Sequence, residues 1–120
     1  NYVGRIIFLI NKVDKFRVGN DSIKETLKKA YSELKKLGFK NIEIYPISSY
    51  AAYLAKMLLY NESLTEDEID ETKRLMRILN RSDYSLNQYY KNRILIENRE
   101  NLLEGLLVNS GILGLEELLY

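Results

Sequence analysis

The sequence predicts an α/β fold, in which a parallel β-α-β unit is followed by an all-helical region. Three observations support this class. An apolar run without polar alternation covers Ile6–Ile10, as in a strand that is buried on both faces. A segment with helical periodicity follows it, and a second run rich in β-branched and aromatic residues covers Asn41–Ile47. Beyond Ser49 the apolar residues recur with helical spacing only.

The composition is that of an ordinary globular protein, with 46% apolar and 29% charged residues. The net charge of +1 gives no global attraction to nucleic acid, and we expect no nucleic-acid partner. The chain has no cysteine, which suits a reducing compartment, so we expect a cytoplasmic protein. Without cysteine and histidine, zinc sites and histidine-based triads are excluded. We expect no catalytic and no metal-binding residues in this chain.

The run Ile6–Ile10 predicts a central strand of a parallel sheet. Such strands need neighbours at both edges and layers on both faces. The chain starts at Asn1 without an initiator Met and offers one other good strand. We therefore expect a fragment of a longer polypeptide.

A helix is predicted over Ser22–Leu37, with Asp21 or Ser22 as its N-cap. Gly38 should end it in the left-handed conformation, with Phe39 folding back on the last turn. The expected apolar face consists of Ile23, Leu27, Ala30, Leu34 and Leu37.

The second strand is predicted over Asn41–Ile47, with Pro46 at its end because proline cannot donate a ladder hydrogen bond. Short links between strand, helix and strand predict a right-handed, parallel β-α-β unit. This arrangement places Asn11–Asp14 and Ser48-Ser49 at the same edge of the sheet, where open α/β sheets hold their ligands.

The remaining elements are predicted to be helices. Tyr50–Tyr60 is apolar nearly all round and should be buried. A capping box of Thr65 and Glu68 begins a helix that runs to about Leu79, with Ile69, Leu75, Met76 and Leu79 on its apolar face. Asp83–Asn98 fits either a short helix or a loop held down by its aromatic residues. Two further helices are expected over Arg99–Val108 and Ile112–Leu119, the last with Leu115, Leu118 and Leu119 inward.

The polar residues after the two strands suit the pairing edge of guanine, which presents the adjacent donors N1–H and N2–H₂. The carboxylate of Asp14 can accept from both at once, and adenine would leave it unpaired. Asn11 can donate to N7, and the stem of Lys12 can lie across the base plane. Backbone N–H groups at Ser48, Ser49 and Tyr50 are placed to donate to O6, and the Ser48 hydroxyl to hold Asp14.

Asn-Lys-x-Asp after an apolar strand resembles the base-reading motif of the P-loop GTPases. The second loop strengthens this resemblance, because Ser48 follows Asp14 by 34 positions at the end of the next strand. The family typically has Ser-Ala-Lys where this chain has Ser48-Ser49-Tyr50, which keeps the backbone donors but not the third residue. Within the family, Pro46–Lys56, the helical insertion after it and Ser110–Leu119 are similar to bacterial dynamin-like proteins.

The resemblance implies the distal half of a Rossmann-like P-loop GTPase domain. Residues 1–60 would form part of its α/β core, residues 61–109 a helical insertion, and residues 110–120 the beginning of its closing helix. The parent protein would bind GTP or GDP with Mg²⁺, hydrolyse GTP, self-associate and remodel membranes, peripheral to them. The chain lacks the phosphate loop and the Asp-x-x-Gly motif, so the missing N-terminal half is an expected partner and the fragment should be inactive alone.

Two alternatives remain open. The parent could be another P-loop GTPase, of the Era-like or septin-like groups. The chain could instead be a non-catalytic α/β module whose helical half binds a protein, in which case Asp14 would cap a turn and Lys12 would be merely solvated.

Overall fold

The computed structural model describes residues 6–11, 23–81, 84–90 and 101–119 of the 120-residue chain. These residues form two parallel strands, five α-helices and a short 3₁₀ helix. In chain order the elements are β1 (Ile7–Ile10), α1 (Ile23–Lys36), β2 (Glu43–Pro46), α2 (Ser49–Leu59), α3 (Glu66–Leu79), η2 (Leu86–Tyr89), α4 (Leu102–Asn109) and α5 (Ile112–Leu119). The predicted α/β class, a β-α-β unit followed by helices, is confirmed.

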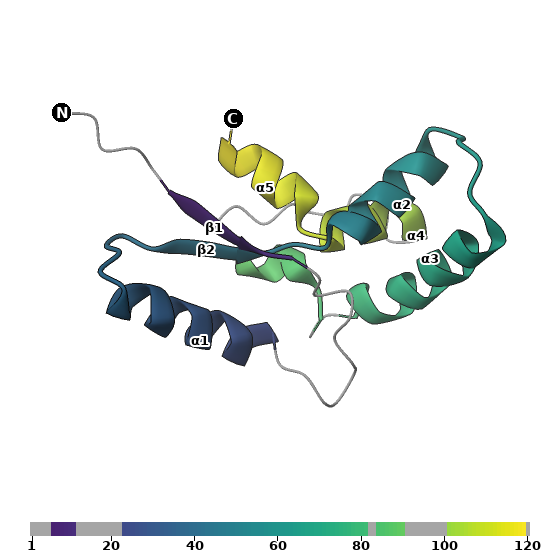
Figure 1. Ribbon diagram of the computed structural model, residues 1–120. Helices are drawn as coiled ribbons and strands as arrows, with labels where there is room; N and C mark the ends of the chain where they lie inside the picture. The colour runs from purple at the N-terminus through teal and green to yellow at the C-terminus, as the bar shows by residue number, and fades with distance from the viewer. Residues whose placement is uncertain (1–5, 12–22, 82–83, 91–100, 120) are drawn as a thin grey trace.

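The two strands run parallel, with Phe8 opposite Ile44 and Ile10 opposite Pro46. Because side chains alternate along a strand, the pair has two faces. Figure 1 shows α1 on one side of the strands and α5 on the other. On the α1 side the ring of Phe8 meets that of Phe39 edge to face, with centroids 5.2 Å apart. The sheet is therefore the middle layer of a three-layer arrangement.

The prediction that Ile6–Ile10 is a central, buried strand is wrong for the described residues. Within residues 6–11, 23–81, 84–90 and 101–119, β1 pairs with β2 alone. Ile6 is 56% exposed and Leu9 is 47% exposed. An apolar run shows that a strand prefers burial, but the neighbours that would bury it must come from elsewhere in the structure.

The end of α1 is determined by its local sequence. Gly38 has a φ of 97°, its N–H donates to the carbonyl of Lys35, and the N–H of Phe39 donates to the carbonyl of Leu34. These two bonds make the Schellman motif that glycine favours, as predicted.

The expected inward position of Leu37 is wrong, because this side chain is 75% exposed. Leu37 follows the last helical residue, so helical spacing no longer directs it. The cap predicted at Asp21 or Ser22 lies outside the described residues.

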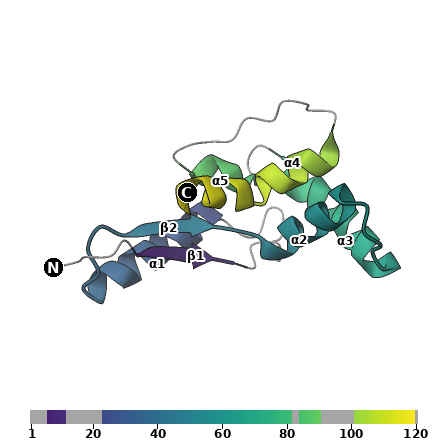
Figure 2. The same ribbon diagram turned by 90° about the horizontal axis from the view of Figure 1, so that it is seen from above.

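Helices α2, α3 and α4 pack together beyond the carboxyl ends of the strands, as Figures 1 and 2 show. Their shared core is built from Leu54, Leu75, Leu79, Leu86 and Leu106, all at most 1% exposed. The prediction that Tyr50–Tyr60 is buried holds for Ala51, Ala52, Leu54 and Ala55, but it is wrong for Tyr53 and Tyr60, which are exposed. The predicted inward positions of Ile69 and Leu119 are also wrong, because these side chains are 39% and 57% exposed.

The N-terminus of α3 carries the predicted capping box. The N–H of Glu68 donates to Thr65 Oγ1 at 3.2 Å, and the N–H of Thr65 donates to Glu68 Oε1 at 2.9 Å. The backbone hydrogen bond from Thr65 lowers the pKa of Glu68, with smaller contributions from the side chains of Thr65 and Tyr53. The carboxylate of Glu68 therefore stays charged, which suits the positive end of the helix dipole.

The described part of the predicted ambiguous segment, Asp83–Asn98, is a 3₁₀ helix followed by a buried tyrosine. The ring of Tyr90 stacks on that of Tyr45, with centroids 4.8 Å apart, and its hydroxyl donates to the carbonyl of Pro46 at 2.9 Å. Burial, and then the neighbouring Tyr45, raises the pKa of Tyr90 well above its usual range. The phenol therefore stays protonated, and it remains a donor to β2.

The backbone of Gly111 and Gly114 approaches Tyr90 closely. A Cβ on Gly114 would lie 2.7 Å from Cγ of Tyr90, and a Cβ on Gly111 would lie 2.9 Å from the carbonyl oxygen of Pro46. Gly111 also has a φ of 87°, which a side chain disfavours. The two glycines thus let α5 approach β2 with Tyr90 between them.

Candidate functional site

The carboxyl ends of β1 and β2 lie next to each other. The N–H of Ile47 donates to the carbonyl of Ile10 at 2.8 Å, which continues the ladder one residue past the end of β2. The next residues of the two segments, Asn11 and Ser48, therefore leave the sheet at the same edge. This edge is where parallel α/β sheets form ligand sites.

Asn11 and Ser49 form a reciprocal pair of hydrogen bonds across this edge. The amide Nδ2 of Asn11 donates to Ser49 Oγ at 2.8 Å, and the backbone N–H of Ser49 donates to Asn11 Oδ1 at 3.1 Å. The two residues are 38 positions apart in the sequence, and both are exposed. The first residue of the Asn-Lys-x-Asp sequence is therefore in direct contact with the second predicted loop.

Ser48 directly precedes Ser49 in the chain, and it is completely buried. It is the N-cap of α2, because its Oγ accepts from the N–H of Ala51 at 3.1 Å. Its own N–H donates to the carbonyl of Ser110 at 2.9 Å. The N–H of Ser48, which the sequence predicted to face guanine O6, is thus bonded inside the protein. Ser48 therefore holds the loop in place through buried hydrogen bonds.

Tyr50 occupies the first turn of α2 and borders the Asn11–Ser49 pair along the chain. Its ring is 36% exposed and stacks on that of Tyr53, with centroids 6.5 Å apart and planes 14° apart. The N-terminus of an α-helix carries a partial positive charge and presents N–H groups. The edge near Ser49 therefore favours an acceptor such as a carbonyl oxygen.

Lys12, Val13 and Asp14 lie outside the described residues. The structure therefore places four of the six predicted site residues, Asn11, Ser48, Ser49 and Tyr50, and brings them to one edge of the sheet.

Ser110 is a supporting residue that the sequence patterns did not single out. It is completely buried; its hydroxyl donates to the carbonyl of Leu107 at 2.6 Å and accepts from the N–H of Ile112 at 3.3 Å. Its carbonyl holds the N–H of Ser48. The Asn109-Ser110-Gly111 sequence signals a helix break, but helical periodicity says nothing of this distant contact.

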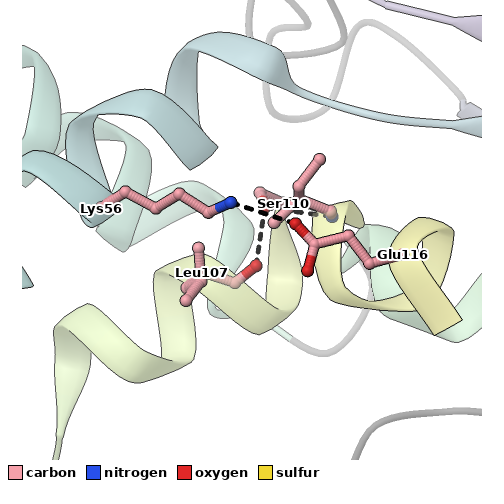
Figure 3. A network of polar contacts seen from close by, with 5 residues as sticks. Lys56, Leu107, Ser110 and Glu116 are labelled. Carbon is pink, nitrogen blue, oxygen red and sulfur yellow. Dashed lines mark hydrogen bonds and ion pairs between the residues drawn. The ribbon is translucent and has the colours of Figure 1, made fainter.

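Figure 3 shows an ion pair beside Ser110, between Lys56 of α2 and Glu116 of α5. The two charged atoms are 3.0 Å apart, and the side chains are 42% and 43% exposed. Such an exposed pair contributes about 0–1 kcal/mol. The hydrogen bond from the Ser48 N–H to the Ser110 carbonyl, between two completely buried residues, is therefore the more important link between the C-terminal helices and the Ser48 loop.

Two findings concern other kinds of site in the described part of the chain. No group of three or more acidic, cysteine or histidine side chains among residues 6–11, 23–81, 84–90 and 101–119 could hold a metal ion. None of the helices seen there combines the length and the apolar character needed to span a bilayer.

No family model, no curated protein and no solved structure matches this chain. Its function is therefore inferred from the residues at the two strand ends.

Replacing Asn11 by Ala removes both hydrogen bonds to Ser49 and should lower the free energy of unfolding by about 1 kcal/mol, since the pair is exposed. Ser49→Ala removes one of the two bonds and should cost about half as much. Urea unfolding of both variants and of Asn11→Ala/Ser49→Ala measures the coupling between them. The exposed Ser63→Ala serves as control. Additive effects of the two single changes would show that the bond between Asn11 Nδ2 and Ser49 Oγ contributes nothing.

Proposed function

We propose that this chain recognises the base of a guanine nucleotide, with Asn11, Lys12 and Asp14 on one side and Ser48, Ser49 and Tyr50 on the other. The observation that carries the proposal is the reciprocal bond between Asn11 and Ser49. It joins the residue that begins Asn-Lys-x-Asp to the loop that must face the same base. If Asn11 belonged to a merely solvated turn after β1, no hydrogen bond to the second loop would be expected.

Each residue has a distinct task in the proposed pocket. The carboxylate of Asp14 accepts from N1–H and N2–H₂ of guanine, two charge-assisted bonds worth roughly 1.5–3 kcal/mol each. The stem of Lys12 covers one face of the base. The amide of Asn11 donates to N7 while its Oδ1 keeps the bond from Ser49.

The second loop supplies the positive edge for guanine O6. Ser48 is buried and bonded on both its N–H and Oγ, so we assign it a positioning role. The donors to O6 then come from Ser49 and Tyr50, at the start of α2. Binding at Ser49 requires that its N–H be shared between Asn11 Oδ1 and the base.

The chain carries residues for the base alone. Its 120 residues contain no Gly-x-x-x-x-Gly-Lys-Ser/Thr sequence for phosphates and no Asp-x-x-Gly sequence for Mg²⁺. We therefore assign GTP hydrolysis, Mg²⁺ binding and self-association to a larger dynamin-like GTPase of which this chain would be part. Base recognition without phosphate contacts should be weak.

An NMR titration with GMP and AMP tests this function on the ¹⁵N-labelled chain. We expect GMP to shift the backbone signals of Ser49 and Tyr50 and the side-chain amide signal of Asn11, with a dissociation constant of about 1 mM or weaker. AMP should leave these signals in place, because adenine turns an acceptor towards Asp14. Equal shifts with both nucleotides, or none at these groups with GMP, would contradict the proposal.

A further inference from the structure

The turn between α1 and β2 lies at the opposite end of the sheet from the proposed base pocket, as Figure 1 shows. It holds a depression of about 390 Å³, a volume within the range of small-ligand sites. The residues that line the depression are Tyr31, Lys35, Gly38, Phe39, Lys40, Asn41 and Ile42. This feature takes no part in the Asn11–Ser49 edge.

The segment around this depression is strongly basic. Residues 23–40 contain six lysines and two glutamates, in a chain whose net charge is only +1. Lys35, Lys36 and Lys40 are exposed, and in the described part of the chain none of them takes part in an ion pair. Their charges are therefore not neutralised within these residues, and they gather at one end of the molecule.

An exposed aliphatic side chain stands among these lysines. Leu37 is 75% exposed, and Phe39 and Tyr31, which line the depression, are 38% and 44% exposed. Leu37 is held outward by the Schellman motif at Gly38, so its exposure follows from a well-bonded turn. A nucleic-acid duplex presents its charged phosphates outward and keeps most of its apolar base surface stacked inside, so a leucine can reach that surface only in a groove or between bases. The boundary between lipid headgroups and acyl chains offers an apolar partner directly next to negative charge.

We propose that the α1–β2 turn binds the surface of an anionic phospholipid membrane. A headgroup phosphate occupies the depression between Lys35 and Lys40, Lys36 adds attraction to the surface, and Leu37 enters the acyl boundary. The patch formed by Lys35, Lys36, Leu37 and Lys40 contains no arginine. Lysine suits diffuse attraction to a charged surface, whereas arginine suits paired hydrogen bonds to the edge of a base. Since the patch is remote from the base pocket, the two sites can be occupied together, and neither inference depends on the other.

Co-sedimentation with vesicles tests the proposal, using phosphatidylcholine vesicles with and without phosphatidylglycerol. The chain should bind only the anionic vesicles. Lys35→Gln/Lys40→Gln should weaken binding by roughly 25-fold, since each lysine near an anionic surface contributes about fivefold. Leu37→Asn should weaken it by about tenfold or more, through the loss of apolar burial.

Two matched controls distinguish an effect of the patch from an effect of net charge and from nonspecific hydrophobic binding. Lys73→Gln/Arg77→Gln removes the same charge from the exposed side of α3, and Leu102→Asn changes another exposed leucine. Both should bind nearly as the unchanged chain does. Losses as large as those at the patch would overturn the proposal, as would binding that ignores phosphatidylglycerol. Duplex DNA or inorganic phosphate binding at the patch in place of vesicles, unaffected by Leu37→Asn, would overturn it too.

Discussion

If this chain recognises guanine as proposed, replacing Asp14 by Asn should reverse its base preference from guanine to xanthine. The amide of Asn accepts from N1–H, but it places a donor opposite guanine N2–H₂. Xanthine carries a carbonyl at that position, which accepts from the amide. Loss of a charge-assisted bond of about 2–3 kcal/mol corresponds to a decrease of roughly 30- to 150-fold in affinity for GMP.

NMR titration with GMP and XMP measures this reversal at the signals of Ser49 and Tyr50. Asp70→Asn makes the same chemical change at an exposed position of α3, and it should keep the guanine preference. A guanine preference that survives Asp14→Asn would remove the specificity role from Asp14. Such a result, with unchanged GMP shifts at Ser49, would also return Asp14 to the role of a turn cap.

The second large effect concerns the stability of the fold, at Gly111 and Gly114, which lie against the ring of Tyr90. Gly114→Ala should destabilise the fold by about 1–3 kcal/mol, because the new Cβ would lie 2.7 Å from Cγ of Tyr90. The ring cannot easily retreat, since it stacks on Tyr45 and its hydroxyl is bonded to Pro46. Gly111→Ala adds the penalty of a positive φ, about 1–2 kcal/mol, to its own close contact.

The matched control is Gly105→Ala in α4. Its Cβ would meet Asn80 at 3.4 Å and φ there is not positive, so the helix should gain up to about 1 kcal/mol from the replacement. Urea unfolding of the three variants measures the difference. Gly114→Ala should cost less in a Tyr90→Ala background, because the clash has gone. Equal stability of the Gly105, Gly111 and Gly114 variants would contradict the packing described for Tyr90.

A substitution that disturbs the packing at Gly111 should also disturb the proposed base pocket. Gly111 follows Ser110, whose carbonyl holds the N–H of Ser48. A displaced Ser110 leaves a buried donor unsatisfied, which costs roughly 1–3 kcal/mol. The C-terminal helices are therefore part of the support of the second loop, although they lie more than 50 residues further along the chain.

Local signals in the sequence were sufficient for the element types and for several helix ends. Gly38 ends α1 through the Schellman motif, and Thr65 and Glu68 cap α3 in the predicted way. Both devices work through hydrogen bonds between residues at most five positions apart, so the chain's own order determines them. The meeting of Asn11 with Ser49 could also be expected, because parallel strands in a β-α-β unit end at one edge.

What the sequence alone determined about this protein is the β-α-β order, several helix ends and the polar residues after each strand. Only the tertiary structure decided that Leu9 is exposed, and that the N–H of Ser48 is bonded to the carbonyl of Ser110. Periodicity names the apolar face of an element, but the element that covers that face is chosen by packing between distant segments. The hydrogen bond from Tyr90 to Pro46 joins residues that are 44 positions apart. The sequence around each residue gives no indication of the other, so local patterns do not predict this contact.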